Sequence, residues 1–340
     1  MTLDATLEAL LPSLLEAYGP PGRETGVRSV LRRALRGLGT VTEQSTGNLH
    51  VHRPGRGTRL LLMTAMDAPG LIVTRVDGSG LGRVSLIGSG RTPTELVGAT
   101  VRFEDSRRGI LGADRPKASK DAVELEADQL FFETGLSPKE AARLFPVGSV
   151  GAIEDRPSRL GDLWCAANLD NRAGCAAVVA ALRSVRTSGY DLHVIFSAQS
   201  DPAARGALTG AFGVNPEMAV VVEVAHVDPK ETAGIAVGKG PALCLKEEGY
   251  VAHPEALAVA KRAAAAARVK TQWLIRETEG SDARSIRAAR AGVPTALLAI
   301  PARRTGGPFS LAHTRDIAQT AALVAKLVTL GTAKRKGGSR

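Results

Sequence analysis

The sequence has 340 residues, of which 44% are hydrophobic and 23% are charged. This composition excludes a disordered chain and is enough for about two domains. The formal net charge is +10, but four cations (Lys334, Arg335, Lys336, Arg340) lie in a basic tail over 334–340 that we expect to be disordered. Because no nucleic-acid motif or aromatic stacking platform accompanies the charge, a nucleic-acid partner is disfavoured.

No apolar run approaches the ~18 residues that a membrane span needs, and the first segment carries acids in place of the basic region of a signal peptide. Three cysteines, Cys165, Cys175 and Cys244, are an odd number without metal-binding spacing. These observations predict reduced thiols in a cytoplasmic protein that makes no membrane contact.

The first 68 residues begin with helical periodicity and end in a strand. Leucines at 7, 10, 11, 14 and 15 predict one amphipathic helix, and a second follows the GPPGRE break. The stretch 58–66 is short, aliphatic and bounded by Gly and Pro, as is 70–76, so both are predicted to be strands.

From about 70 to 157 short strand-like pieces alternate with turns, and the only clear helical pattern is SPKEAARLF. We therefore expect a small β-rich domain over 69–157.

After residue 158, helical and strand patterns alternate on a larger scale. Helices are predicted at 171–187, 255–268, 282–291 and 316–331, and strands at 191–198, 218–225, 269–275 and 295–300. This alternation indicates an α/β layered sheet, and apolar runs such as AVVVEVA fit strands covered on both faces. The predicted architecture is one α/β domain, 1–68 plus 158–333, interrupted by the β-rich insertion.

Polar residues, most of them acidic, directly follow the apolar segments of this domain. In open α/β sheets ligands gather at the carboxyl ends of strands, and acids crowded there repel one another unless a cation lies among them. This is the physical argument for a divalent metal site. The residues concerned are Asp67, Asp170, Gln199-Ser200-Asp201, Glu223, Gly280-Ser281-Asp282 and Arg303.

Each of these residues taken alone has a plainer interpretation. Asp170 and Asp282 each precede a predicted helix, where an N-cap role is common. Asp201 and Glu223 fit surface turns, or ion-pair partners of Arg172 and Arg205. Their order and spacing together favour a site.

The motifs GNLHVH, LLLMTAMDAPGLIV, NLDNRAGCAAVVAAL, VIFSAQSDPAARGA, VVVEVAHVDP and EGSDARSIRAARAGVPTALLAIPAR occur in this order. Together they resemble the TET-type dinuclear metalloaminopeptidases, which include glutamyl and deblocking aminopeptidases. The resemblance implies a zinc-exopeptidase-like mixed sheet flanked by helices, with an inserted PDZ-like β-barrel that mediates assembly into dimers and dodecamers. It also implies two divalent metals, Zn or Co, held by two histidines and carboxylates, with a Glu as general base.

When the family's site residues are matched to this sequence one by one, several of the metal-binding and catalytic residues are missing. Ala65 stands at the position of the first metal-binding His, and Gly306 stands at that of the second. Ser200 occupies the position of the general base. Asp67, which in the family orients the first His, is retained.

Three residues match metal ligands: Asp170 the bridging Asp, Asp201 a shortened Glu, and Glu223 an Asp. The retained Gly280, Ser281, Asp282 and Arg303 match the substrate side of the family's cleft. The three remaining ligands are all carboxylates, which suit Mg or Ca better than a pair of zinc ions. We therefore expect no metal or one weakly bound divalent ion.

Two functional hypotheses follow, and a nucleic-acid binder ranks last. The first is a catalytically impaired homologue that binds peptides or acts through assembly into homo-oligomers. The second is a weak metalloaminopeptidase that uses one metal, with Ser200 or a recruited histidine, His226 or His313, in place of the base. These histidines are otherwise expected to be solvated loop residues.

Overall fold

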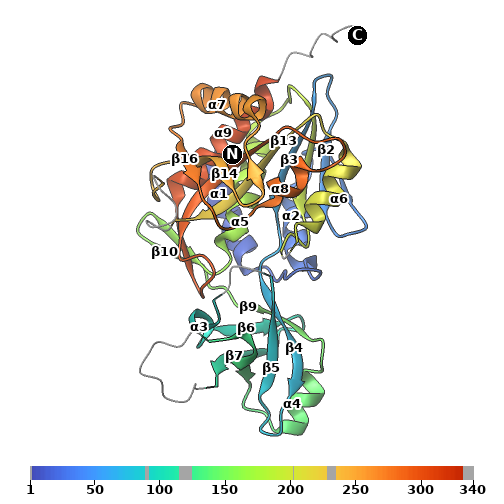
Figure 1. Ribbon diagram of the computed structural model, residues 1–340, viewed down its shortest axis with the longest axis vertical. Helices are drawn as coiled ribbons and strands as arrows, with labels where there is room; N and C mark the ends of the chain where they lie inside the picture. Colours follow the sequence, from blue (N-terminus) through green and yellow to red (C-terminus); the bar gives the residue numbers. More distant parts are fainter. Residues whose placement is uncertain (1, 89–91, 115–124, 202, 228–234, 332–340) are drawn as a thin grey trace.

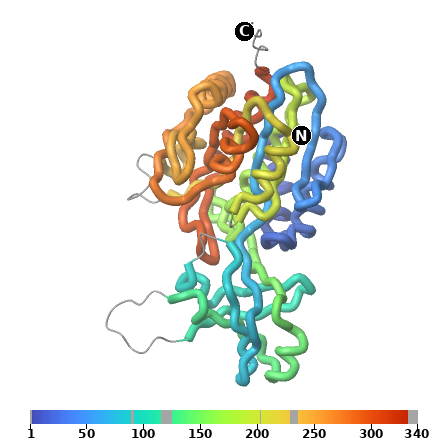
Figure 2. The backbone as a smooth tube through the Cα atoms, turned by 45° about the vertical axis from the view of Figure 1, so that its right-hand side comes forward, coloured from blue at the N-terminus to red at the C-terminus, as the bar shows by residue number. Residues whose placement is uncertain are grey.

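The computed structural model describes residues 2–88, 92–114, 125–201, 203–227 and 235–331. The basic tail over 334–340 lies outside these ranges. The described chain forms a large body of sheet and helices above a smaller barrel, and a narrow neck joins the two in both views (Figures 1 and 2).

Helices and strands alternate through most of the chain. The helices are α1 (Leu3–Glu16), α2 (Thr25–Ala34), α3 (Pro93–Leu96), α4 (Pro138–Leu144), α5 (Leu169–Ser184), α6 (Arg205–Val214), α7 (Pro254–Ala267), α8 (Asp282–Arg287), α9 (Thr314–Leu330) and the 3₁₀ turn η1 (Ala127–Gln129). The strands of the body are β1 (Thr40–Glu43), β2 (Leu49–Arg53), β3 (Arg59–Ala65), β10 (Ser158–Leu160), β11 (Leu163–Ala166), β12 (Asp191–Ser197), β13 (Met218–His226), β14 (Ala242–Glu247), β15 (Tyr250–Val251), β16 (Gln272–Ile275), β17 (Thr295–Arg303) and β18 (Ser310–His313).

The body contains one mixed sheet in the order β1-β2-β12-β3-β13-β17-β18-β11-β10, with β14 attached to β17 and β16. Its centre is parallel: β12 pairs with β3, β3 with β13, and β13 with β17. The central strands are buried along almost their whole length because helices cover both faces. The predicted mixed α/β sheet flanked by helices is confirmed.

Two apolar layers cover the sheet. On one face α1, α2, α5, α7 and α9 bury a large core that includes the leucines of α1, and on the other face α6 and α8 bury a smaller one. Strand β12 contributes to both layers: Val194 and Phe196 face the first, and Ile195 faces the second. The alternation of β12 therefore fixes which of its side chains point toward α6.

The chain leaves the sheet after β3 and builds a closed barrel in the order β4-β5-β8-β7-β6-β9. These strands are β4 (Gly70–Val76), β5 (Gly82–Ile87), β6 (Thr100–Phe103), β7 (Arg108–Ala113), β8 (Leu130–Glu133) and β9 (Val150–Ile153). Phe103, Phe132 and Phe145 fill its interior with ring centroids 4.7 to 5.1 Å apart. The expected inserted β-barrel is confirmed.

Hydrogen bonds across the neck hold the barrel against the body. The Tyr18 hydroxyl donates to the carbonyl oxygen of Val150 at 2.9 Å, and the Arg102 guanidinium donates to the carbonyl oxygen of Glu16 at 2.7 Å. Arg102 also lies over the Tyr18 ring, 5.9 Å from its centroid. The barrel is therefore fixed where the end of α1 and the residues after it meet β6 and β9.

The structure corrects several predicted element bounds. Strands β1, β2, β14 and β18 were not predicted, because short strands are recognised by their partners more than by their own pattern. The helix predicted over 282–291 ends at Arg287, and Arg290 has a left-handed φ of 57° that no helix continues. None of the helices in the described ranges is both long and apolar enough to cross a membrane.

Candidate active-site pocket

The carboxyl ends of β3, β12 and β13 meet at one edge of the sheet and open into a cavity of about 620 Å³. The first turns of α5 and α8 and residues of the barrel connection complete its wall. The cavity is lined by Ala65, Asp67, Pro69, Thr92, Ala167, Asp170, Asn171, Ser200, Asp201, Ala204, Glu223, Val224, His226, Glu248, Arg276, Glu279, Gly280, Ser281, Asp282, Arg284, Thr305 and Gly306.

Nearly all residues singled out from the sequence lie around this cavity, although they come from six separate segments. They are Ala65, Asp67, Asp170, Ser200, Asp201, Glu223, Gly280, Ser281, Asp282 and Gly306. Arg303 is not among the lining residues: it ends β17 and its side chain is exposed. The expected substrate-side position of Arg303 therefore has no geometric support.

Asp67 is an almost fully buried part of the cavity wall, with 4% of its surface exposed. Its two carboxylate oxygens accept the backbone N–H groups of Ser200 and Asp201, each at 3.1 Å. Burial, together with the neighbouring carboxylates of Glu24 and Asp282, raises the pKa of Asp67 to about 8, although these two hydrogen bonds lower it. Asp67 therefore fixes the backbone of the loop after β12.

Asp282 connects three elements at the cavity floor. Ser200 Oγ donates to Asp282 Oδ1 at 2.5 Å, and Ser197 Oγ donates to Asp282 Oδ2 at 2.7 Å. The backbone N–H of Asp282 in turn donates to Glu223 Oε1 at 3.0 Å. Burial raises the pKa of Glu223, and the Asp282 carboxylate raises it further; burial also raises the pKa of Asp282. These two carboxyl groups therefore release their protons less readily than exposed ones.

A buried ion pair fixes the loop between β16 and α8. The Arg276 guanidinium donates to Glu247 Oε2 at 2.7 Å, and both side chains are almost fully buried. The other oxygen of Glu247 accepts the backbone N–H of Ser281 at 2.8 Å and also the Ser281 hydroxyl. Ser281 caps α8 by accepting from the N–H of Ala283, so Ser281 and not Asp282 is the N-cap. Neither Glu247 nor Arg276 was picked out from the sequence.

Asn171 lies beneath the cavity and links α5 to two strands. Its Nδ2 donates to Thr64 Oγ1 at 3.0 Å and to the carbonyl oxygen of Val222 at 2.9 Å. The preceding Asp170 is exposed at the mouth of the cavity, with a non-helical backbone (ψ 110°) inside the first turn of α5. The Asn171 contacts therefore set the position of the Asp170 backbone.

The two histidines weighed as replacement ligands have different surroundings. His226, the last residue of β13, lines the cavity, and its Nδ1 lies 3.0 Å from Thr305 Oγ1. His313 ends β18 and caps α9, where its Nδ1 accepts the N–H of Arg315 at 3.0 Å. Neither is a loop residue, which corrects that expectation. His313 does not line the cavity.

A separate set of possible metal ligands lies at the other end of β12. In the described part of the chain, His52, Asp191 and His193 are the one group of three His, Cys, Asp or Glu side chains whose ligand atoms all lie within 4.8 Å of one another. In the parallel pairing of β12 with β3, Asp191 is opposite Arg59 and Ser197 is opposite Ala65. Six residues of strand, roughly 20 Å, therefore separate this group from the cavity.

The model of the M42 glutamyl aminopeptidase family matches residues 47–323. The chain belongs to this family. A lysyl aminopeptidase of Pyrococcus furiosus is 27% identical over 336 residues, which cover 94% of this chain and 96% of that protein. Members of the M42 family generally bind divalent metals. The predicted family is confirmed.

Two solved structures share the fold of this M42 homologue. The TET aminopeptidase of Thaumarchaeota archaeon SCGC AB-539-E09 superimposes with a TM-score of 0.89 at 24% identity, covering 95% of this chain and 97% of that one. The TET1 peptidase of Pyrococcus horikoshii, which can assemble into a tetrahedron or a large octahedral shell, gives a TM-score of 0.84 at 20% identity, covering 97% and 100%.

Proposed function

We propose that this M42 homologue binds the amino-terminal ends of peptides in the cavity, assembles with copies of itself, and hydrolyses peptide bonds poorly or not at all. The proposal rests on the kinds of metal-binding side chains that line the cavity. Of the described residues that line it, His226 alone offers an imidazole, and Ala65 and Gly306 stand where the family resemblance implies two metal-binding histidines. Zinc prefers nitrogen and sulfur ligands, so the donors present do not fit two zinc ions.

The side chain at the general-base position supports the same proposal. Ser200 is a hydroxyl at neutral pH and its proton is directed to Asp282 Oδ1, so it offers no basic atom to an attacking water. Loss of a positioned base typically lowers a rate by about 10²- to 10⁴-fold.

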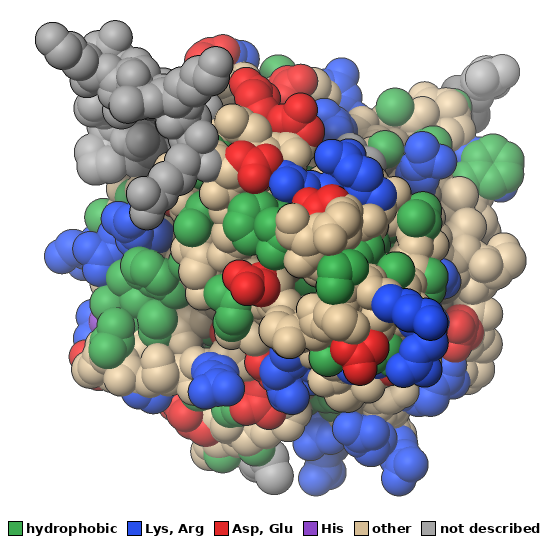
Figure 3. Space-filling model, turned by 90° about the horizontal axis from the view of Figure 1, so that it is seen from below, with side chains coloured by type: hydrophobic (Ala, Val, Ile, Leu, Met, Phe, Trp, Pro, Cys, Tyr) green, Lys and Arg blue, Asp and Glu red, His purple; other side chains and the backbone are tan. Residues whose placement is uncertain are grey.

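The charge of the cavity favours a cationic ligand group. Seven carboxyl side chains line the cavity against two arginines, and Arg276 is already paired with Glu247. Even when the three carboxyls with raised pKa values, Asp67, Glu223 and Asp282, are left out, four carboxyls remain against the two arginines. A peptide amino terminus carries one positive charge, which such a wall attracts. On the face seen from the barrel end, cationic side chains are interleaved with acidic and apolar ones and form no continuous stripe (Figure 3). This distribution favours peptides over nucleic acid as ligands.

Self-assembly is proposed from the whole-chain likeness to proteins that form large particles. The P. horikoshii TET1 peptidase, covered over its full length, can form a tetrahedron or an octahedral shell. We expect this chain to form homo-oligomers between a dimer and a dodecamer, and we place them in the cytoplasm because all three cysteines are free. Light scattering of the purified protein should give a mass well above 35.4 kDa; a monomer at micromolar concentration would contradict the assembly.

Activity and binding can be measured separately. We expect aminoacyl-anilide hydrolysis in added Zn²⁺, Co²⁺ or Mn²⁺ to be at least about 10²-fold below that of an active M42 enzyme measured in parallel. Fluorescence anisotropy should show binding of a labelled peptide with a free amino terminus, and acetylation of that terminus should abolish it. Ordinary family rates would overturn the proposal, as would equal binding of the acetylated peptide.

A second candidate function is a weak aminopeptidase with one divalent ion. Asp170, Asp201, Glu223 and His226 all line the cavity, and carboxylate oxygens with one imidazole suit Mg²⁺ or Mn²⁺. If this function holds, low hydrolysis should require Mn²⁺ and disappear in a variant that combines Asp170→Asn with Glu223→Gln. Activity that survives in this variant would exclude it.

A further inference from the structure

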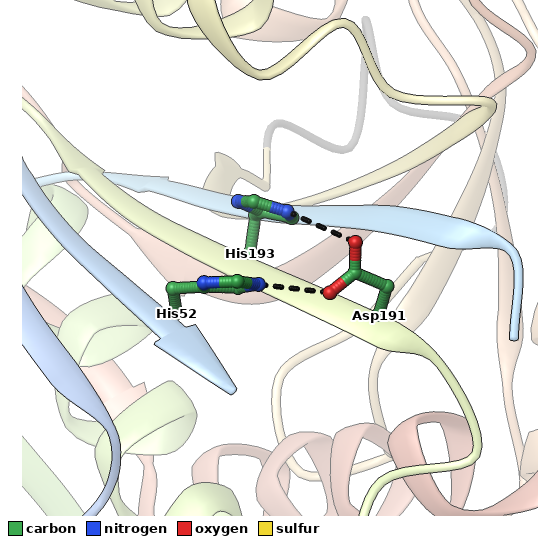
Figure 4. Close-up of side chains that lie close together, drawn as sticks. All are labelled: His52, Asp191 and His193. Atoms are coloured by element: carbon green, nitrogen blue, oxygen red, sulfur yellow. Dashed lines mark hydrogen bonds and ion pairs between the residues drawn. The ribbon is translucent and has the colours of Figure 1, made fainter. Parts of the chain in front are cut away.

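We propose that His52, His193 and Asp191 form a zinc site at the end of β12 remote from the cavity, where one ion joins β2 to β12. This inference goes beyond the proposed function and does not depend on it. His52 comes from β2, whereas His193 and Asp191 come from β12 (Figure 4). None of the three lines the cavity.

The strand pairing places the two imidazoles side by side. In the antiparallel pairing of β2 with β12, His52 is directly opposite His193. Their rings are stacked, with centroids 4.3 Å apart and planes inclined by 16°. Asp191 lies two residues before His193 and therefore projects from the same face of β12. Two main-chain segments held by sheet hydrogen bonds thus fix all three ligand groups.

The ligand atoms converge on one small volume. His52 Nε2 lies 2.8 Å from Asp191 Oδ1, and His193 Nε2 lies 3.5 Å from Asp191 Oδ2. In Figure 4 the nitrogen ends of the two rings face the two carboxylate oxygens. Ligands of a tetrahedral zinc at about 2.0 to 2.2 Å are separated by roughly 3.3 Å, which lies between the two nitrogen–oxygen distances observed here.

His193 has an unsatisfied atom at this point. Its Nε2 is buried and makes no close hydrogen bond, since the Asp191 Oδ2 that it faces is 3.5 Å away, although buried polar atoms are nearly always paired. Its other ring nitrogen, Nδ1, lies 3.0 Å from His50 Nε2. When Nδ1 carries the proton and donates it to His50, the lone pair of Nε2 points toward Asp191. A metal ion would satisfy this lone pair, and His50 would orient the ligand from outside the coordination sphere.

The site offers a negative charge to a cation. Asp191 supplies a carboxylate, and the guanidinium of Arg59, 3.8 Å from Asp191 Oδ2, also makes hydrogen bonds to the carbonyl oxygens of Val214 and Asn215.

The ion fits the chemistry of zinc and has a route of entry. Two imidazoles and a carboxylate are ligands that zinc accepts, and water would occupy the fourth position. The His52 and Asp191 side chains are 34% and 25% exposed, so an ion reaches the site from solvent. Zinc bound here would stabilise the pairing of β2 with β12, because the unfolded chain separates residues 52 and 191.

The test uses full-length protein stripped with chelator and titrated with ZnCl₂ at pH 7.5. Calorimetry should show a site that is lost in the His52→Gln/His193→Gln double variant and retained in Asp170→Asn/Glu223→Gln, which alters the cavity. The wild type should melt about 4 °C higher at a hundred-fold excess of zinc over Kd. His50→Gln should weaken binding about 10- to 100-fold. His253→Gln, which changes an exposed histidine, is the matched control and should bind as wild type.

Co²⁺ gives a second readout that does not depend on stability. A tetrahedral site with two imidazoles should produce the intense visible absorption of four-coordinate Co²⁺, and Asp191→Asn should weaken or remove it. Circular dichroism of the metal-free variants identifies any that fail to fold. If the double histidine variant fails to fold, the Co²⁺ absorption spectrum of Asp191→Asn tests whether the ion binds at this site. No zinc response in the wild type would overturn the proposal, as would an equal response in the double histidine variant.

Discussion

The hydroxyl of Ser200 donates a 2.5 Å hydrogen bond to Oδ1 of Asp282, across 82 residues of sequence. This bond joins the loop after β12 to the first residue of α8, and Ser197 donates to the other oxygen of the same carboxyl group. Position 200 therefore has a structural role in the cavity floor, which is distinct from the catalytic role that a carboxylate would have there.

Removal of this hydroxyl should cost stability. In Ser200→Ala, Asp282 keeps only the Ser197 hydroxyl among its two side-chain donors, and we expect the free energy of unfolding to fall by about 1–3 kcal/mol. Urea unfolding measures the change. Ser85→Ala, on β5 of the barrel, is the control and should have a small effect. An unchanged unfolding midpoint for Ser200→Ala would show that the bond is not formed in solution.

Restoration of the missing groups should recover hydrolysis. We expect the combined variant Ala65→His, Ser200→Glu, Asp201→Glu and Gly306→His to hydrolyse aminoacyl-anilides at least about 10²-fold faster than wild type in added Zn²⁺ or Co²⁺. Initial rates at saturating substrate measure the gain.

The replacement at position 306 needs its own control. Gly306 has a φ of 94°, which disfavours any side chain and is expected to cost about 1–3 kcal/mol. The same combination with Gly306→Ala has this strain but lacks the imidazole. Equal rates in the two combinations would show that residue 306 does not occupy a ligand position.

Asp67 should make stability depend on pH. An unfolded aspartate ionises near pH 4, whereas buried Asp67 keeps its proton up to about pH 8. Between these values the folded state binds more protons at Asp67, so the contribution of this residue to stability is greatest below pH 4 and falls as the pH rises, by up to about 1.4 kcal/mol per unit. Asp67→Asn removes this dependence. Urea unfolding at pH 5, 6 and 7 should therefore show a steeper decline for wild type, and parallel lines would contradict the raised pKa.

Loss of the ion pair between Glu247 and Arg276 should destabilise the loop before α8. Glu247→Gln leaves a buried guanidinium with less compensating charge, so we expect a loss of about 3 kcal/mol and weaker peptide binding. Glu277→Gln is the matched control, because its pair with Lys246 is exposed and is worth less than about 1 kcal/mol. Thermal unfolding compares the two variants. Similar losses of stability would show that the buried ion pair contributes no more than the exposed one.

The sequence alone determined the kinds of elements and the position of the acids along them. The leucine spacing of α1 and the apolar run of β13 are local patterns, so helix and strand could be predicted where they occur. Asp67, Asp170 and Glu223 close such runs, and parallel strands bring their carboxyl ends to one edge of the sheet. The acid-lined cavity was therefore predictable from strand ends.

Only the tertiary structure decided which distant residues meet. Glu247 ends β14, which was not predicted, and Arg276 follows β16. Their pairing depends on β14 lying beside β16. Arg303 is exposed and does not line the cavity, although its sequence position suggested otherwise. His52 and Asp191 are 139 residues apart and meet because β2 pairs antiparallel with β12. Strand partners and register are long-range choices made by packing, and no local pattern in the chain specifies them.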